Sequence, residues 1–434
     1  QIVATLYWFR RDLRVSDNPS LVAAGAEVYP VVSSSYLSGL GKKRSDSMAA
    51  GWQSLNRDLD GKLTVVDDVA VTAKKLGVSA VHLSASFEPA GIAEQERLTE
   101  QLASSGIRIV IGPGNYAVAP GQVRKPDGTP YRVYTPFFKA WHEVGWSKPV
   151  AAPAGVTWKS AGGAPLPPSS IRAGEAFALE TLEKFRVRAL AGYHEDRNRP
   201  DLSGTSHLSH ALAHGEIHPR TILATLGESG GEITFMKEIA WREFYADVLW
   251  HNPHTVTEYY EPRFAKMRYD SPGEKFEAWK QGKTGYPIVD AGMRQLLETG
   301  WMHNRVRMIV ASFLVKDLHI EWQHGAAWFE EYLTDFDVAS NSHGWQWTAG
   351  CGTDASPYYR IFNPIGQGEK FDPNGNYVRR YVKELRSIDG PAVHQPWLLL
   401  SGLTVGYPAP IVDHALERAE SLARLEEIKV AGAQ

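Results

Sequence analysis

The stretch GWMHNRVRMIVASFLVKDLHIEW, residues 300–322, decides how the second half of the chain folds. Apolar residues recur in it at helical spacing, so that Val306, Ile309, Val310 and Phe313 fall on one face of a helix. Such a face is typical of a helix that packs against a hydrophobic core. We therefore predict one amphipathic helix across this stretch, in a domain built from helices.

The opposite face of the same predicted helix has an unusual composition. It carries a tryptophan, an asparagine, an arginine, a methionine and a serine at the i, i+3, i+4, i+7 spacing: Trp301, Asn304, Arg305, Met308 and Ser312. A solvated face rarely carries Trp and Met, and a buried face rarely carries Asn and Arg. This mixed face raises the question of what it contacts.

The bulk composition is that of an ordinary globular protein. The chain has 434 residues, of which 43% are hydrophobic and 22% charged, and its net charge is −3. This length is enough for two or three domains. The single Cys351 cannot form an internal disulfide and fits a reducing compartment. No apolar run is long enough to span a bilayer, so we expect a cytoplasmic enzyme without a membrane partner.

Short apolar runs alternate with helical patterns in the first third of the chain. This alternation predicts an α/β domain with a doubly wound parallel sheet. Residues 136–175 are rich in Pro, Ala, Gly and Ser and predict an interdomain linker. We thus expect an α/β domain over 1–135 and a larger all-α domain over 176–434. The predicted strands are 5–9, 28–32, 62–66, 80–84 and 107–112, with a helix over 89–106.

Two helical stretches carry residues that could bind ligands. Thr205, Ser206 and Ser209 come just before a predicted helix, where hydroxyls and backbone N–H groups suit a phosphate. A plain helix cap is the simpler alternative. Further on, Glu238 and Arg242 could pair at i, i+4. Trp241 between them makes an ordinary solvated face a poor description.

A third stretch, residues 334–373, contains two close carboxylates. Asp335 and Asp337 flank Phe336, and Asn341 and Trp345 follow. Paired carboxylates with aromatic planes suit a glycosidase, and they suit equally a site that holds a flat polar ring. No metal-binding spacing stands out, and neither GxSxG, a P-loop nor GxGxxG is present. We therefore expect no metal centre.

These stretches together resemble the photolyase/cryptochrome family, and most closely its class I cyclobutane pyrimidine dimer photolyases. The motifs are YWFRRDLRVSDNPSL (7–21), WREFY (241–245), GKTGYPIVDAGMRQL (282–296), TGWMHNRVRMIVASFLVKDL (299–318) and RIFNPIGQGEKFDP (360–373). The resemblance implies that FAD is buried in the helical domain. It also implies that reduced, light-excited FAD donates an electron to a pyrimidine dimer flipped out of single- or double-stranded DNA.

The resemblance assigns roles to individual residues. Those expected around FAD are Tyr193, Thr205, Ser206, His207, Leu208, Ser209, Trp301, Arg307, Asp335, Phe336, Asp337 and Asn341. An ion pair between Arg307 and Asp335 is expected beside the flavin ring, because a buried Arg needs a partner. Asn341 matches the position next to flavin N5, where photolyases typically have Asn.

The mixed face now has an interpretation, because it matches the family's dimer-binding pocket. The residues expected to contact the dimer or DNA are Arg197, Glu238, Trp241, Arg242, Asn304, Arg305, Met308 and Gln367. Glu238 is also a candidate to stabilise the dimer radical anion through a proton or hydrogen bond. We expect DNA binding to weaken as the salt concentration rises.

Trp345 and Trp322 match the inner members of the family's tryptophan chain, which carries electrons to the flavin. The outermost member is normally Trp, and here the match falls on Tyr269. His343 also departs from the usual Asn or Gly. Residues 41–55 and 87–98 lack the patterns expected for an antenna chromophore. The antenna therefore stays open between a pterin, a deazaflavin, another molecule and none.

Functions other than repair also remain open. A cryptochrome-type blue-light photoreceptor is the main alternative, and Glu238, Asn304, Met308 and Asn341 argue against it. A non-catalytic flavoprotein, a single-strand nucleic-acid binder and a glycosidase are further alternatives, and the glycosidase predicts no flavin. We expect a monomer.

Overall fold

The computed structural model describes residues 3–354 and 359–431. The contacts divide the chain into two compact units. Unit 1 comprises residues 1–191 and 206–253, and unit 2 comprises residues 192–205 and 254–434. Each unit is described by itself below.

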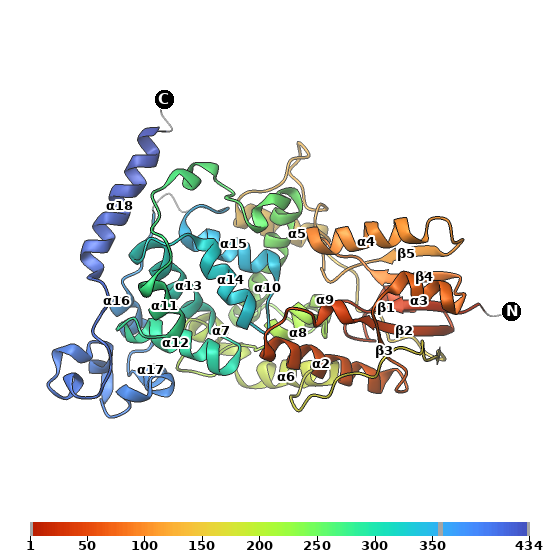
Figure 1. Ribbon diagram of the computed structural model, residues 1–434, viewed down its shortest axis with the longest axis horizontal. Helices are drawn as coiled ribbons and strands as arrows, with labels where there is room; N and C mark the ends of the chain where they lie inside the picture. The colour runs from red at the N-terminus through yellow and green to blue at the C-terminus, as the bar shows by residue number, and fades with distance from the viewer. Residues whose placement is uncertain (1–2, 355–358, 432–434) are drawn as a thin grey trace. The chain divides into compact units, whose positions relative to one another are not determined.

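Unit 1 contains a parallel sheet with the strand order β3-β2-β1-β4-β5 (Figure 1). The order runs outward in both directions from β1, so the sheet is doubly wound, as the alternating sequence pattern predicted. A short β6 adds to β2 through Glu27 and Val28. The strands are β1 Thr5–Trp8, β2 Glu27–Ser33, β3 Thr64–Val66, β4 Ala80–Ser84, β5 Arg108–Gly112 and β6 Thr157–Trp158.

Helices cover both faces of this sheet because successive strand residues point to opposite sides. Leu6 and Trp8 pack on one side with α3 and α4, whereas Tyr7 and Phe9 pack on the other with α2. The covering helices are α1 Pro19–Val22, α2 Lys42–Asp58, α3 Val69–Leu76 and α4 Pro89–Leu102.

The rest of unit 1 contains helices joined by irregular segments. The segment 136–175, predicted as a linker, holds most of α5 and all of β6. The longest helix of this part, α10, carries Glu238 and Trp241, which were predicted to share one helix face. The helices are α5 Tyr134–Val144, α6 Glu175–Arg188, α8 Ser209–His214, α9 Pro219–Leu223 and α10 Gly230–His251.

Unit 2 is built from helices around one large apolar core. The predicted apolar face of residues 300–322 lies in that core, where Val306, Ile309, Val310 and Phe313 are at most 1% exposed. No described helix combines the length and apolar character that crossing a membrane needs. The helices are α7 Tyr193–Asp196, α11 Glu274–Gln281, α12 Pro287–Thr299, α13 Asn304–Ser312, α14 Trp322–Tyr332, α15 Val338–Ala349, α16 Pro364–Phe371, α17 Asn376–Tyr381 and α18 His414–Ala431.

The single helix predicted over residues 300–322 is wrong in its extent. His303 caps the start of α13, because its Nδ1 accepts a hydrogen bond from the backbone N–H of Arg305. After Ser312 the backbone widens into a π-helical turn over Phe313–Asp317. Trp322 then begins a separate helix, α14.

Candidate functional site

The residues expected to bind cofactor and DNA fall in both units. Unit 1 holds those on α10 and those in residues 206–209, and unit 2 holds the remainder, including Thr205. The two groups are therefore described separately.

On α10, Trp241 is held by an aromatic stack. Its ring lies parallel to that of Tyr134, with centroids 3.9 Å apart and an interplanar angle of 3°. The Tyr134 hydroxyl donates to the Lys237 carbonyl at 2.7 Å, which ties α5 to α10. Glu238 and Trp241 are both half-buried on this face. The stack fixes the indole orientation before any ligand arrives.

Arg242 makes its contacts inside unit 1. Its guanidinium donates to the carbonyls of Asn115 at 2.9 Å and Leu212 at 3.4 Å. It also lies over the Tyr116 ring, 4.7 Å from the centroid. These contacts hold the Arg242 side chain against the segment that follows β5. Its expected contact with DNA stays a prediction.

The hydroxyl-rich turn before α8 has a constrained backbone. Leu208, the residue at the helix cap, has no side chain that could accept a hydrogen bond. Ser206 Oγ instead accepts from the Leu208 N–H at 3.2 Å. His207 adopts a φ of 55°, in the left-handed region, which costs energy for a residue with a Cβ. Such strain is typical of turns shaped around a ligand.

One possible metal-binding group lies on α8 and just after its end, and it was not predicted from the sequence. The ligand atoms of His210, His214 and Glu216 lie within 4.8 Å of one another. The i, i+4 spacing of the two histidines was the available signal. Glu216 already accepts from the Gly174 N–H at 2.6 Å and lies 3.1 Å from His210 Nε2. An internal hydrogen-bonded cluster accounts for this arrangement without an ion.

In unit 2, positive charge gathers around Arg305 of α13, where Arg197 at the end of α7 and Arg360 before α16 also act on it. Arg305 donates to Asn198 Oδ1 at 3.1 Å and lies 4.5 Å over the Phe371 ring. Burial lowers the pKa of Arg305, and the charges of Arg197 and Arg360 lower it further. Two further positive charges therefore act on Arg305, and such a concentration of charge favours an anion such as phosphate. We call Arg197, Arg305 and Arg360 the arginine cluster.

The other predicted DNA-contacting residues of unit 2 flank this cluster in sequence. Asn304 is exposed at the start of α13, and Met308 is half-buried one turn later. Gln367 is half-buried on α16, four residues before Phe371 and on the same helix face. The Oε1 atom of Gln367 is buried and has no hydrogen-bond partner among the described residues.

The predicted ion pair between Arg307 and Asp335 forms. The guanidinium donates to both carboxylate oxygens, at 3.2 and 2.7 Å, and also to the Met302 carbonyl. Asp337 has a different task, because its carboxylate caps α15 by accepting from the Ser340 N–H at 2.9 Å. With one carboxylate paired and the other capping a helix, the glycosidase arrangement is not supported.

The α15 helix offers space for a ligand beside Asn341. The side-chain amide of Asn341 donates to the Ala326 carbonyl at 3.1 Å. Three residues later, a Cβ built on Gly344 meets no atom within 4 Å. An open position one helical turn from an oriented amide leaves room for a ligand on this side of α15. Trp301 and Tyr193, also expected at FAD, are half-buried and buried respectively.

Three other residues named from the sequence are His343 on α15, Phe336 in the loop before it and Thr205 in the turn before α8. His343 is fully buried, and its Nε2 lies 2.9 Å from Thr255 Oγ1. Burial lowers the pKa of His343 to about 4, so its ring is neutral near pH 7. Phe336 is buried in the core of unit 2, and Thr205 is half-buried.

The three aromatic residues predicted to carry electrons all lie in unit 2. Trp322 and Trp345 are 1% and 3% exposed, and Tyr269 is half-buried. Trp345 packs against Gly325 of α14, where an added Cβ would come within 2.1 Å of its ring. Only glycine at this position lets the indole approach the helix turn that begins at Trp322.

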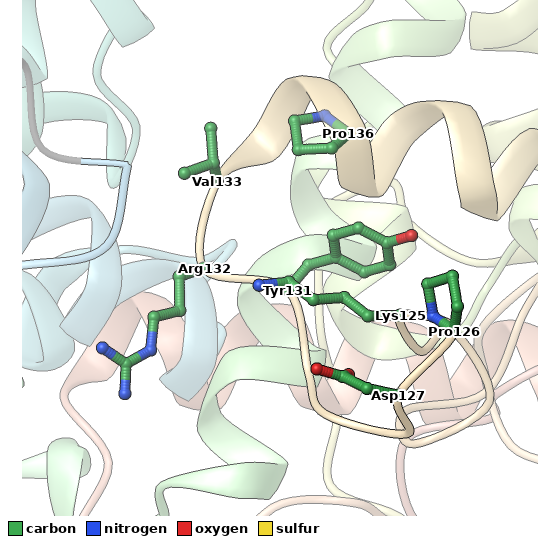
Figure 2. A pocket seen from close by; sticks show the side chains of 7 residues that line it. All are labelled: Lys125, Pro126, Asp127, Tyr131, Arg132, Val133 and Pro136. Carbon is green, nitrogen blue, oxygen red and sulfur yellow. The ribbon is translucent and has the colours of Figure 1, made fainter.

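A surface cavity of 360 Å³ lies outside all of these residues. It is lined by the exposed loop and the start of α5 in unit 1 (Figure 2): Lys125, Pro126, Asp127, Tyr131, Arg132, Val133 and Pro136. Tyr131 extends toward Pro126, whereas Arg132 extends to the opposite side of the loop. None of the predicted site residues lines this cavity.

Comparison with known proteins shows which family the chain resembles in sequence. A model of the FAD binding domain of DNA photolyase matches residues 235–427, and a DNA photolyase model matches residues 5–154. The deoxyribodipyrimidine photo-lyase of Agrobacterium fabrum is 39% identical over 98% of both chains. That of Escherichia coli is 35% identical over 97% of this chain and 98% of its own.

Solved structures show the same fold. A bacterial class III photolyase from Agrobacterium tumefaciens superposes with a TM-score of 0.90 at 36% identity, covering 99% of this chain and 98% of the other. The cryptochrome of Synechocystis sp. PCC6803 superposes with a TM-score of 0.88 at 27% identity, covering 98% and 99%. This chain, with its FAD-binding domain, belongs to the DNA photolyase family.

Proposed function

We infer that this chain is a light-dependent deoxyribodipyrimidine photo-lyase, which splits cyclobutane pyrimidine dimers in DNA. One observation carries this inference: proteins of that name match the chain over nearly the full length of both partners, at 35–39% identity in Agrobacterium fabrum and Escherichia coli. A match of this extent includes both the sheet-containing unit and the helical unit.

The residues present fit FAD as the cofactor. Bound FAD, when reduced and excited by light, supplies the electron that opens the cyclobutane ring. The Arg307–Asp335 pair and the amide of Asn341 would orient the flavin ring, and the open position at Gly344 leaves it room. The strained turn at His207 would hold the phosphates through backbone N–H groups.

A second group of residues suits damaged DNA as the substrate. The arginine cluster would bind backbone phosphates in single- or double-stranded DNA, because a phosphate would offset the repulsion that Arg305 experiences from the other two charges. Trp241, already oriented by Tyr134, would pack on the dimer. Glu238 and Asn304 would hydrogen-bond the carbonyl and imide edges of the bases. Flipping costs a few kcal/mol, and less for a damaged pair.

The test is repair itself. The purified protein is reduced and incubated with a thymine-dimer oligonucleotide in light and in darkness, after its absorption spectrum has been recorded. Loss of the dimer only in light supports the photolyase function. Bound flavin without repair favours the cryptochrome alternative. The structural similarity to the Synechocystis cryptochrome supports considering that alternative.

Several finer assignments stay predictions. The motifs in residues 282–296 and 360–373 favour class I, whereas a class III photolyase is among the similar structures, and a phylogeny of each unit separately would decide. An antenna, whether a pterin, a deazaflavin or another molecule, would add an absorption band beside that of the flavin. A cytoplasmic location and a monomer rest on the single Cys351 and on composition, and light scattering tests the monomer.

A further inference from the structure

A tyrosine that the sequence comparison did not single out lies between two members of the predicted electron chain. The Tyr259 ring is edge-on to Trp322 and stacked on Tyr269, with centroid distances of 6.3 Å in both cases. All three residues belong to unit 2, and Tyr259 is 8% exposed. An electron passing between Trp322 and Tyr269 therefore has an aromatic ring beside both.

The two tryptophans of the predicted electron chain have no base among the described residues that could accept their indole protons. Nε1 of Trp322 and Nε1 of Trp345 are buried, and neither has a hydrogen-bond partner among the described residues. An indole N–H can only donate, so it needs an acceptor nearby to lose its proton. Either indole, once oxidised, would keep its positive charge and remain a strong oxidant.

Tyr259 is the first aromatic residue outward from the tryptophans with a base in contact. Its hydroxyl donates to Oε2 of Glu321 at 2.7 Å. Glu321 occupies the N-cap position of α14, yet its carboxylate does not cap the helix. Instead it faces the phenol. Burial raises the pKa of Tyr259 far above the usual range, so the phenol keeps its proton until the ring is oxidised.

We propose that Tyr259 is a redox relay between Trp322 and Tyr269, with the Glu321 carboxylate as its proton acceptor. The proposal rests on the proposed function, because it concerns light-driven reduction of the same flavin. Trp345 gives one electron to the light-excited oxidised flavin, and Trp322 gives one electron to Trp345. Tyr259 then gives one electron to Trp322 and its phenolic proton to Glu321, which leaves a neutral tyrosyl radical.

The outer step restores Tyr259 and carries the oxidation to the surface. Tyr269 gives one electron to Tyr259, Glu321 returns the proton to the Tyr259 oxygen, and the proton of half-exposed Tyr269 passes to water. An exogenous thiol then returns one electron to Tyr269, and water returns the proton. The relay thus explains how a chain whose outermost member is Tyr can still discharge a buried Trp322.

The test uses the FAD-loaded full chain with oxidised flavin, excited by blue light. Transient absorption and electron paramagnetic resonance follow the radicals in H₂O and in D₂O. The wild type should form a neutral tyrosyl radical, and its formation should slow in D₂O because a proton moves with the electron. Tyr259→Phe should abolish this radical and lengthen the life of the Trp322 radical cation by about tenfold or more.

Glu321→Gln tests the proton acceptor independently of the ring, because the variant keeps Tyr259 and replaces the carboxylate base with a neutral amide. We expect a smaller yield of tyrosyl radical and loss of the D₂O effect. Tyr381→Phe is the matched control, since Tyr381 packs on Tyr377 elsewhere in unit 2, and it should leave both signals unchanged. A tyrosyl radical that survives Tyr259→Phe but disappears in Tyr269→Phe would overturn the relay.

Repair by chemically reduced wild-type protein separates this proposal from the proposed function. Repair in light without any tyrosyl radical during photoreduction would overturn the relay alone. A tyrosyl radical without repair would overturn the proposed function and leave the relay standing.

Discussion

Both oxygens of the Asp335 carboxylate accept hydrogen bonds from the guanidinium of Arg307, and the Asp335 side chain is 1% exposed. A two-point ion pair of this kind fixes the plane of the guanidinium. Removing the Asp335 charge would leave the Arg307 guanidinium, which is only 24% exposed, without a counter-charge. The pair is therefore a test of both stability and cofactor orientation.

We expect Asp335→Asn to lower the free energy of unfolding of the apoprotein by about 2–4 kcal/mol, because Arg307 loses its counter-charge. Urea denaturation measures this loss. Glu180→Gln is the control, since Glu180 pairs with Arg172 where both side chains are exposed, and it should cause no measurable change. Equal stability of Asp335→Asn and the wild type would mean that the ion pair contributes nothing.

Glu238 tests the assignment of α10 to the dimer. We expect Glu238→Ala to keep bound FAD and to lower light-driven repair by about tenfold or more, because a hydrogen bond to the developing charge is lost. The measurement is repair per absorbed photon at saturating DNA. Glu298→Ala, at an exposed position on α12, should repair like the wild type. Full repair by Glu238→Ala would remove Glu238 from the mechanism.

Most of the fold was predictable because its signals are local. The five main strands and α4 follow from short apolar runs and helical periodicity, which need no knowledge of the rest of the chain. Strand β6 was missed because it has two residues and exists only by pairing with β2. A pattern that short carries no periodicity.

The break in the predicted helix over 300–322 has a long-range cause. The π-helical turn includes Lys316, whose Nζ donates to the Arg360 carbonyl, and Asp317, whose carboxylate binds His414. Both partners lie far along the sequence. The local pattern remained helical, so only the folded chain reveals where the helix widens and stops.

Only part of the site was predictable, because some of its contacts join residues that lie far apart in the sequence. The pair of Arg307 and Asp335 was predicted because the resemblance placed both residues beside the flavin and a buried Arg needs a partner. The contact between Tyr259 and Glu321 joins residues 62 positions apart, and neither belongs to a recognisable motif. The capping role of Asp337 was hidden because two close carboxylates look alike in sequence, whatever each one bonds.

The arginine cluster predicts how DNA binding depends on salt. We expect Arg305→Ala to weaken binding to dimer-containing DNA and to reduce the slope of log K against log salt by about 1, because one phosphate contact is lost. Fluorescence anisotropy across a salt series measures both. Arg268→Ala is the matched control, since the charge of Arg268 is already balanced by Glu420 and Glu427. An unchanged slope in Arg305→Ala would place the phosphates elsewhere.

His343 predicts a specific dependence of stability on pH. Burial lowers its pKa from 6.5 to about 4 in the folded chain, so between these values the unfolded chain binds a proton that the folded chain does not. Stability from this residue is therefore complete above pH 6.5 and is lost as the pH falls toward 4. The loss amounts to about 3 kcal/mol at most.

The measurement is urea denaturation of the wild type and of His343→Gln from pH 7 to pH 4.5. Glutamine can still bond Thr255, whose Oγ1 lies 2.9 Å from His343 Nε2, but it cannot titrate. The wild type should lose more stability on acidification than the variant, and the difference isolates His343 from the other titrating groups. Parallel pH profiles would mean that the ring is protonated in the folded state, contrary to its full burial.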